Sequence, residues 1–173
     1  EIIEFSRKLP DPTETKDMLP LSEELAAAVK KQTAELKAIL SGQSDRIVLI
    51  IGPCSADSED SVLDYVSRLV PVQEKVKDRI LIVPRIYTNK PRTTGEGYKG
   101  LVHQPDPNAR PNLLRGIITT RELHMRVVKE TGFAGADEML YPENYPYLDD
   151  LLGYVAVGAR SVEDQSLDRK SVV

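Results

Sequence analysis

The stretch from residue 85 to residue 94, Arg-Ile-Tyr-Thr-Asn-Lys-Pro-Arg-Thr-Thr, is where the residue types point most directly to a chemistry. It combines three cations with three threonine hydroxyls, and no acidic residue lies between Asp78 and Glu96 to neutralise them. Arginine offers a planar two-pronged donor, lysine a point charge and threonine a hydroxyl, a combination that suits a phosphate group. Because the whole chain carries a net charge of −4, this basic stretch is a local feature. The stretch therefore predicts an anion-binding site.

The composition excludes several other classes of protein. A length of 173 residues with 40% hydrophobic residues fits one soluble globular domain or a little more. The acidic balance and the low aromatic content of 5% argue against a nucleic-acid or membrane-surface binder. Apolar runs such as residues 47–51 are far shorter than a bilayer span. The single cysteine, Cys54, excludes a disulfide within the chain and favours a reducing, cytoplasmic location.

Strand-like runs alternate with helical patterns along most of the chain. Repeated alternation of this kind predicts parallel strands joined by right-handed crossovers, in an α/β layer or a barrel. The expected strands cover residues 46–51, 80–87, 134–140 and 155–161, and the expected helices cover 22–42, 58–77, 112–132 and 145–152.

Some local features carry expectations of their own. Residues 1–20, with three prolines among charges, predict an extended N-terminal arm, and the missing initiator methionine suggests a clipped or incomplete N-terminus. The β-branched run at 46–51 is typical of a strand buried on both faces. Pro71, inside the second expected helix, predicts a kink or an early end. The apolar stripe of the first helix is interrupted at Gln32.

In folds of this type the working residues lie at the carboxyl ends of the strands. The first expected strand ends in Gly-Pro-Cys-Ser at residues 52–55, and the second ends in Arg85 and the basic loop. The third ends in Asp137 and Glu138, and the fourth in Gly-Ala-Arg-Ser at residues 158–161. One rim of the molecule is therefore expected to carry a thiol, several cations and a carboxylate.

Each of these residues also has an ordinary interpretation. A lone cysteine such as Cys54 is more often a small buried hydrophobe than a metal ligand, although its place beside a rigid turn suits a projecting ligand. Cations on loops are usually solvated, Glu138 can simply pair with one of them, and Arg160 can be a surface residue. His124 fits a helical pattern on which we expect it at an exposed or edge position, and His103, in the polar loop, can be solvent-exposed.

Taken together, the motifs resemble those of class I 3-deoxy-D-arabino-heptulosonate 7-phosphate (DAHP) synthases, from about residue 1 to residue 165. Any one motif is moderate evidence, but all of them in order and spacing make a specific match. They are Ile-Gly-Pro-Cys-Ser at 51–55, Arg-Ile-Tyr at 85–87, Lys-Pro-Arg-Thr-Thr at 90–94, Gly-Tyr-Lys-Gly-Leu at 97–101, Glu138, and Gly-Ala-Arg at 158–160.

The resemblance implies a (β/α)8 TIM barrel that condenses phosphoenolpyruvate with erythrose 4-phosphate in the first step toward the aromatic amino acids. It implies that Cys54 is a ligand of a divalent metal ion, which in this family is Mn, Fe, Co or Zn. Glu138 is expected near the reacting water, and both Lys90 and Glu138 are expected to be catalytic. The expected substrate-binding residues are Arg85 and Arg160 for phosphoenolpyruvate, Arg92 and Thr93, beside Lys90, for erythrose 4-phosphate, and Ala159, which precedes Arg160.

The resemblance also divides the chain. Residues 1–45 correspond to an N-terminal arm and helix that contribute to subunit contacts and to feedback control by an aromatic amino acid in a homo-oligomer. Residues 46–165 correspond to the first half of the barrel, and residues 166–173 form an atypical tail. A whole barrel needs about 250 residues, so we expect little or no synthase activity from this chain alone. The alternative is a non-catalytic fragment or pseudo-enzyme that acts through association.

Overall fold

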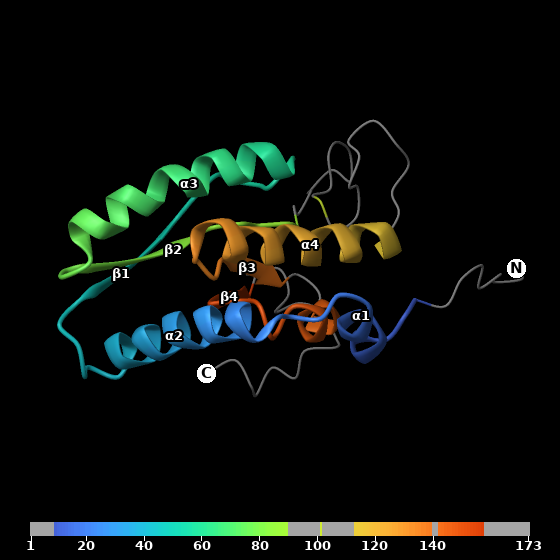
Figure 1. The fold of residues 1–173 in the computed structure, drawn as a ribbon, viewed down its shortest axis with the longest axis horizontal. Helices are drawn as coiled ribbons and strands as arrows, with labels where there is room; N and C mark the ends of the chain where they lie inside the picture. The colour runs from blue at the N-terminus through green and yellow to red at the C-terminus, as the bar shows by residue number, and fades with distance from the viewer. Residues whose placement is uncertain (1–8, 90–100, 102–112, 140–141, 158–173) are drawn as a thin grey trace, which may run out of the picture.

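Strands and helices alternate along the chain and form a mixed α/β fold (Figure 1). The computed structural model describes residues 9–89, 101, 113–139 and 142–157. The elements in chain order are α1 (Pro12–Met18), α2 (Glu23–Leu40), β1 (Ile47–Ile51), α3 (Glu59–Val76), β2 (Ile80–Pro84), α4 (Leu113–Thr131), β3 (Ala136–Met139), the 3-10 helix η1 (Pro142–Tyr147) and β4 (Tyr154–Val157).

The described strands all run in the same direction. β1 pairs in parallel with β2, with Ile47 opposite Ile80, and β3 pairs in parallel with β4, with Ala136 opposite Tyr154. An isolated parallel bridge between Arg85 and Ala136 connects the two pairs. The parallel arrangement confirms the α/β prediction, and the four strands are half of the number that a TIM barrel contains.

The second expected strand, residues 80–87, is shorter in the structure because the chain changes partners after Pro84. The amide of Arg85 still donates to the carbonyl of Ile51 at 2.8 Å, whereas the amide of Ile86 donates to the carbonyl of Ala136 at 2.8 Å. The end of β2 thus lies between the end of β1 and the start of β3. This position brings the residues that follow the strands together at one edge.

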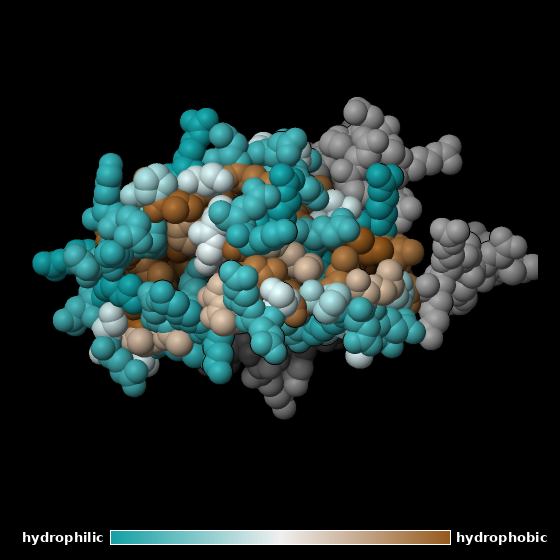
Figure 2. Space-filling view, in the orientation of Figure 1, coloured by the Kyte–Doolittle hydropathy of each residue, from teal (hydrophilic) through white to brown (hydrophobic). Residues whose placement is uncertain are grey.

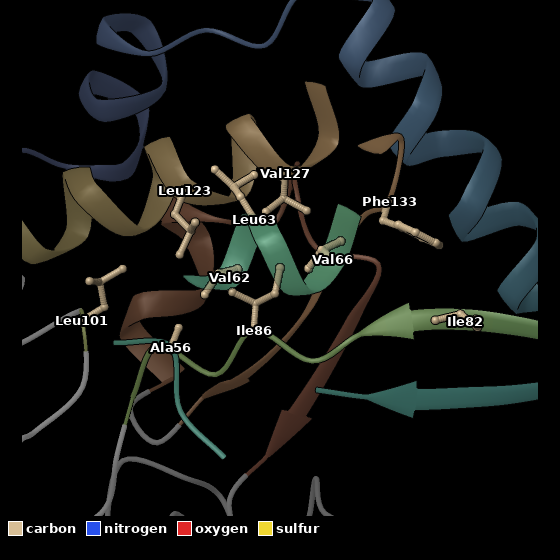
Figure 3. Close-up of a cluster of buried hydrophobic side chains, with 10 residues drawn as sticks. All are labelled: Ala56, Val62, Leu63, Val66, Ile82, Ile86, Leu101, Leu123, Val127 and Phe133. Carbon is tan, nitrogen blue, oxygen red and sulfur yellow. The ribbon is translucent and has the colours of Figure 1, made fainter. Parts of the chain in front are cut away.

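Helix α4 lies between α2 and α3 and contacts both (Figure 1). A first apolar core fills the space between α3, α4 and the end of β2, as Figure 3 shows. Its buried members are Ala56, Val62, Leu63, Val66, Ile82, Ile86, Leu101, Leu123, Val127 and Phe133. A second core between α2, α4 and β3 consists of Val29, Val128, Ala134, Met139, Leu148, Leu151 and Leu152.

Two helices begin after a capping serine, and two end near a glycine. The Ser22 hydroxyl accepts a hydrogen bond from the amide of Leu25 and caps α2, and the Ser58 hydroxyl caps α3 in the same way. Gly42 and Gly132, which follow α2 and α4, both have a φ of 75°, a conformation that favours glycine.

The expectation of an extended N-terminal arm is wrong over residues 12–18, which form helix α1. Asp11 and Glu14 make a reciprocal capping box, and Pro12 occupies the first turn, where its missing N–H costs nothing. The prolines that suggested an extended arm therefore include one that starts a helix.

Of the two alternatives expected at Pro71, a kink or an early end, the early end is wrong, because α3 continues to Val76. Interactions beyond the proline hold the helix in place. The side-chain amide of Gln73 donates to the carbonyl of Ile80 at 2.8 Å and accepts from the amide of Ile82 at 2.7 Å. These two bonds tie α3 to β2 and offset the cost of the proline.

The expectation that the first strand is buried on both faces is wrong. Ile47, Leu49 and Ile51 are 67%, 39% and 38% exposed, whereas β2 is buried from Leu81 to Pro84. Within the described part of the chain β1 pairs with β2 alone, and its alternate side chains face away from the packed helices.

The expected helix at 145–152 is instead the 3-10 helix η1, which begins earlier and contains Pro146. A proline inside a short helix removes one backbone donor, which disfavours a regular α-helix.

Within the described ranges, no helix is long and apolar enough to cross a membrane. Figure 2 shows a helical face that is mostly hydrophilic, with apolar side chains visible between the helices.

Candidate active site at the strand ends

Three of the predicted site residues lie within the described part of the chain, and the structure brings all three to the same edge. They are Cys54 after β1, Arg85 after β2 and Glu138 near the end of β3. The remaining predicted residues, Lys90, Arg92, Thr93, Ala159 and Arg160, lie outside the described residues.

Gly52 allows the ends of β1 and β2 to meet. A Cβ atom at this position would lie 2.3 Å from the carbonyl oxygen of Arg85 and 2.8 Å from its Cβ. Real side chains do not approach a backbone this closely, so position 52 requires a glycine if Arg85 is to keep its place. The glycine of the Gly-Pro-Cys-Ser motif therefore has a packing role as well as a turn role.

The guanidinium of Arg85 is oriented by its neighbours. Its Cζ lies 3.9 Å from the centroid of the Tyr87 ring, which is a cation–π contact. One terminal nitrogen, Nη2, donates to the carbonyl of Cys54 at 3.4 Å. Burial raises the pKa of Tyr87, although the charge of Arg85 opposes this effect, so the phenol stays neutral under Arg85.

Ser55 lies beside Arg85 and Tyr87. The residues on either side of it both contact this segment: Cys54 accepts from Arg85, and the amide of Ala56 donates to the carbonyl of Tyr87 at 2.8 Å. Because Ile86 and Ala56 point into the first core (Figure 3), the alternation of an extended chain directs Arg85 and Tyr87 away from it.

Several buried polar atoms at this edge have no hydrogen-bond partner. In the described part of the chain they include Arg85 Nε and Ser55 Oγ, together with Asn89 Oδ1. Buried polar groups normally have a partner, so each such group needs an explanation. A guanidinium N–H and a hydroxyl are both donors, and an anion bound at this edge would satisfy them.

The end of β3 is tied to the segment that follows β2. The side-chain amide of Asn89 donates to the carbonyl of Glu138 at 3.3 Å, and the amide of Glu138 donates to Asp137 Oδ1 at 2.7 Å. The backbone of Glu138 is therefore fixed relative to residues 88 and 89.

The prediction that His124 occupies an exposed or edge position is wrong. Its side chain is 1% exposed, and its Nε2 lies 3.1 Å from Asp137 Oδ2. The signal was present in the sequence, because residue 124 follows Ile117 by seven and precedes Val128 by four, on the inner face of α4. The contact with Asp137 joins helix α4 to strand β3, and the spacing of residues along the chain does not predict it.

The described residues supply one candidate metal ligand. Cys54 is exposed at the strand end, as a projecting ligand would be and a buried hydrophobe would not. No group of three or more His, Cys, Asp or Glu side chains in the described ranges is arranged to hold a metal ion. A catalytic metal usually needs at least three protein ligands, so these residues alone do not form the site.

Comparison with known proteins identifies the family. The family model described as the DAHP synthetase I family matches residues 25–172. The chain belongs to the DAHP synthetase I family. It is 38% identical to a phospho-2-dehydro-3-deoxyheptonate aldolase of Haemophilus influenzae over 146 residues. These residues cover 84% of this chain and 40% of that protein.

Other members of the DAHP synthetase I family match over a similar share of their length. The Phe-sensitive phospho-2-dehydro-3-deoxyheptonate aldolase of Escherichia coli is 34% identical to this chain. The match covers 95% of this chain and 46% of that protein. A solved structure of the Francisella tularensis aldolase superposes with a TM-score of 0.86 at 30% identity, covering 96% of this chain and 48% of that one. The chain thus spans slightly less than half the length of these relatives.

Proposed function

We propose that this chain provides the phosphoenolpyruvate-binding side of a DAHP synthase, a transferase that condenses phosphoenolpyruvate with erythrose 4-phosphate in aromatic amino acid biosynthesis. The observation that carries the proposal is the pair of unpartnered buried donors at the strand ends. Arg85 Nε and Ser55 Oγ lie at one edge, with the guanidinium of Arg85 held over Tyr87. We take phosphoenolpyruvate as the anion because the chain belongs to the DAHP synthetase I family.

The arrangement suits the chemistry of two phosphorylated substrates. Both are anions, so positive groups must offset their repulsion before the enol carbon can approach the aldehyde. Arg85 is the described residue that does this, Arg160 is proposed to complete the phosphoenolpyruvate contacts, and Ala159 is proposed as a further substrate-binding residue. Lys90, Arg92 and Thr93 are proposed to serve erythrose 4-phosphate, and Glu138 the reacting water.

The proposal extends to the parts of the enzyme that the family implies. They are a (β/α)8 barrel, a divalent metal ion (Mn, Fe, Co or Zn), a homo-oligomer, feedback inhibition by an aromatic amino acid and a cytoplasmic location. Cys54 would be one metal ligand, and the other ligands would have to come from outside the described residues. Residues 1–45 would serve subunit contacts and regulation, and residues 46–165 the barrel.

A synthase assay tests this function. The complete polypeptide encoded by the gene that carries this sequence, supplied with Mn²⁺, is expected to form DAHP from the two substrates. The Arg85→Ala variant is expected to lose at least about tenfold in kcat/KM, because a charge-assisted contact is removed. A folded, metal-supplied wild-type polypeptide that forms no product would contradict the proposal.

For the 173-residue polypeptide alone we expect substrate binding without turnover, because its described part holds one candidate metal ligand. Robust turnover by this polypeptide would overturn that expectation. Reading the DNA downstream of Val173 separates an enzyme from the non-catalytic alternative. A continuation that encodes further lysine, histidine and carboxylate residues supports the enzyme.

A further inference from the structure

A buried carboxylate lies directly behind the proposed substrate edge. Asp137 is fully buried, and its Oδ1 accepts from the amides of Thr88 at 2.9 Å and Glu138 at 2.7 Å. Its Oδ2 accepts from the Thr88 hydroxyl at 2.6 Å and lies 3.1 Å from His124 Nε2. A carboxylate has about four lone-pair positions, so the four contacts use its full capacity.

The pattern of donors determines which nitrogen of His124 carries a proton. Both backbone amides donate to Oδ1, so Oδ2 is the oxygen that faces the Thr88 hydroxyl and Nε2 of His124. The other ring nitrogen, Nδ1, is buried without a partner. Because Nε2 faces the carboxylate and Nδ1 has no partner, this geometry favours the tautomer with a proton on Nε2.

The carboxylate connects the two strand ends that carry the candidate site residues. Thr88 follows Arg85 by three residues, and Glu138 is the next residue after Asp137. The two hydrogen bonds from Thr88 and the hydrogen bond from the Glu138 amide all end on the Asp137 carboxylate. Loss of this group would remove three of the hydrogen bonds at this edge and leave the Ile86 and Asn89 bonds to β3 in place.

We propose that Asp137 is a positioning residue that fixes the Arg85 and Glu138 strand ends relative to each other. His124 orients the Asp137 carboxylate from α4. The role rests on the proposed function, because the site that it positions is the phosphoenolpyruvate site. A misplacement of about 1 Å in such a site costs up to about a hundredfold in rate, so an anchor of this kind matters for function.

The opposite end of β3 offers a matched control. There the Gln32 side chain donates to the carbonyl of Ala134 at 2.6 Å and accepts from its amide at 2.9 Å. Gln32 and Asp137 are both buried side chains that hold the backbone at one end of β3. They differ in that only Asp137 lies at the substrate edge.

Nuclear magnetic resonance of the histidine ring nitrogens tests the anchor itself. The chain has two histidines, so a His103→Gln variant assigns the signals of His124. The wild type is expected to show a proton on Nε2. In Asp137→Asn the side-chain amide takes the place of Oδ2 and must donate, so the proton is expected to move to Nδ1. The same tautomer in both proteins would overturn the anchor.

Titration with phosphoenolpyruvate tests the positioning role. Asp137→Ala is expected to weaken binding about tenfold or more, and Asp137→Asn to recover most of the loss, because it keeps an acceptor for both amides. Gln32→Met is expected to lower stability and leave the affinity unchanged. Wild-type affinity in folded Asp137→Ala, or an equal loss in Gln32→Met, would overturn the role.

Two further outcomes keep the inference and the proposed function separate. If Asp137→Ala does not fold, Thr88→Val removes one hydroxyl and keeps the amide, and is expected to weaken binding about threefold. Unchanged affinity in Thr88→Val would then count against the role. If the wild type does not bind phosphoenolpyruvate, the proposed function fails and the positioning role fails with it, while the His124 tautomer still shows whether the anchor exists.

Discussion

At the scale of single residues, Arg85 owes its position to neighbours that leave it little freedom. Its backbone pairs with both β1 and β3, and its guanidinium lies on Tyr87 while it donates to the Cys54 carbonyl. Such preorganisation reduces the entropy that a ligand must offset when it binds. Gly52 makes the arrangement possible, because a larger residue would collide with the Arg85 backbone.

Replacing Gly52 by alanine should therefore affect both stability and binding. The added methyl group displaces Arg85, and we expect a loss of about 1–3 kcal/mol in the free energy of unfolding, which is typical of overpacking. We also expect weaker binding of phosphoenolpyruvate. Urea unfolding measures the first effect and calorimetric titration the second.

Gly132→Ala is the matched control for this substitution. Position 132 has open space but a φ of 75°, so the alanine is strained and costs about 1–2 kcal/mol without touching the strand ends. Its affinity for phosphoenolpyruvate should equal that of the wild type. Equal affinities in both alanine variants would contradict the role given to Gly52.

At the scale of elements, Arg121 joins helix α4 to the end of α1 and to η1. It is completely buried on α4 and forms a two-pronged ion pair with Asp150, with nitrogen–oxygen distances of 2.7 Å and 2.9 Å. It also donates to the carbonyl of Leu19, just after α1, and to that of Tyr147 in η1. Four parts of the chain therefore depend on one guanidinium.

Arg121→Met should destabilise the fold by about 3–5 kcal/mol, the usual cost of breaking a buried pair from one side. Arg68→Ala removes an exposed pair with Asp64 on α3 and should cost less than about 0.5 kcal/mol. Urea unfolding of the two variants gives the comparison. Similar losses in both would show that Arg121 does not hold α1 and η1 to α4.

The same pair predicts a dependence on pH. Burial alone would raise the pKa of Asp150, but the hydrogen bonds and charge of Arg121 outweigh burial and lower it. A lowered folded-state pKa gives stability that is present above the unfolded value of about 3.9 and is lost as the pH falls below it. Wild type should lose this contribution on acidification, and Arg121→Met should not show the loss.

Local signals in the sequence predicted most of the helices and strands. Contacts between different elements explain where the structure differs from the prediction. The caps at Ser22 and Ser58 and the glycines at 42 and 132 depend on adjacent residues, so they could be predicted. The passage of α3 through Pro71 depends on Gln73 reaching β2, which spacing along the chain does not reveal. The positions of Arg85, Cys54 and Glu138 at strand ends could be predicted from the strand pattern. The contact of His124 with Asp137 could not, because it joins a helix to a strand.

At the scale of the whole molecule, parallel strands bring three separate segments to one edge. The chain has a net charge of −4, yet this edge presents Arg85 with an unpartnered nitrogen. The exposed face of β1, with Ile47, Leu49 and Ile51, shows that the described part leaves one side of its sheet uncovered. Both features fit a unit that is about half of a DAHP synthase in length.

Calorimetric titration of the purified 173-residue polypeptide with phosphoenolpyruvate tests the central claim most directly. We predict saturable binding at one site, weakened about tenfold or more by Arg85→Ala and unchanged by Arg68→Ala, which removes the same charge from an exposed helix face. The absence of saturable binding, or equal affinity in Arg85→Ala and wild type, would contradict the claim that the strand ends form the substrate site.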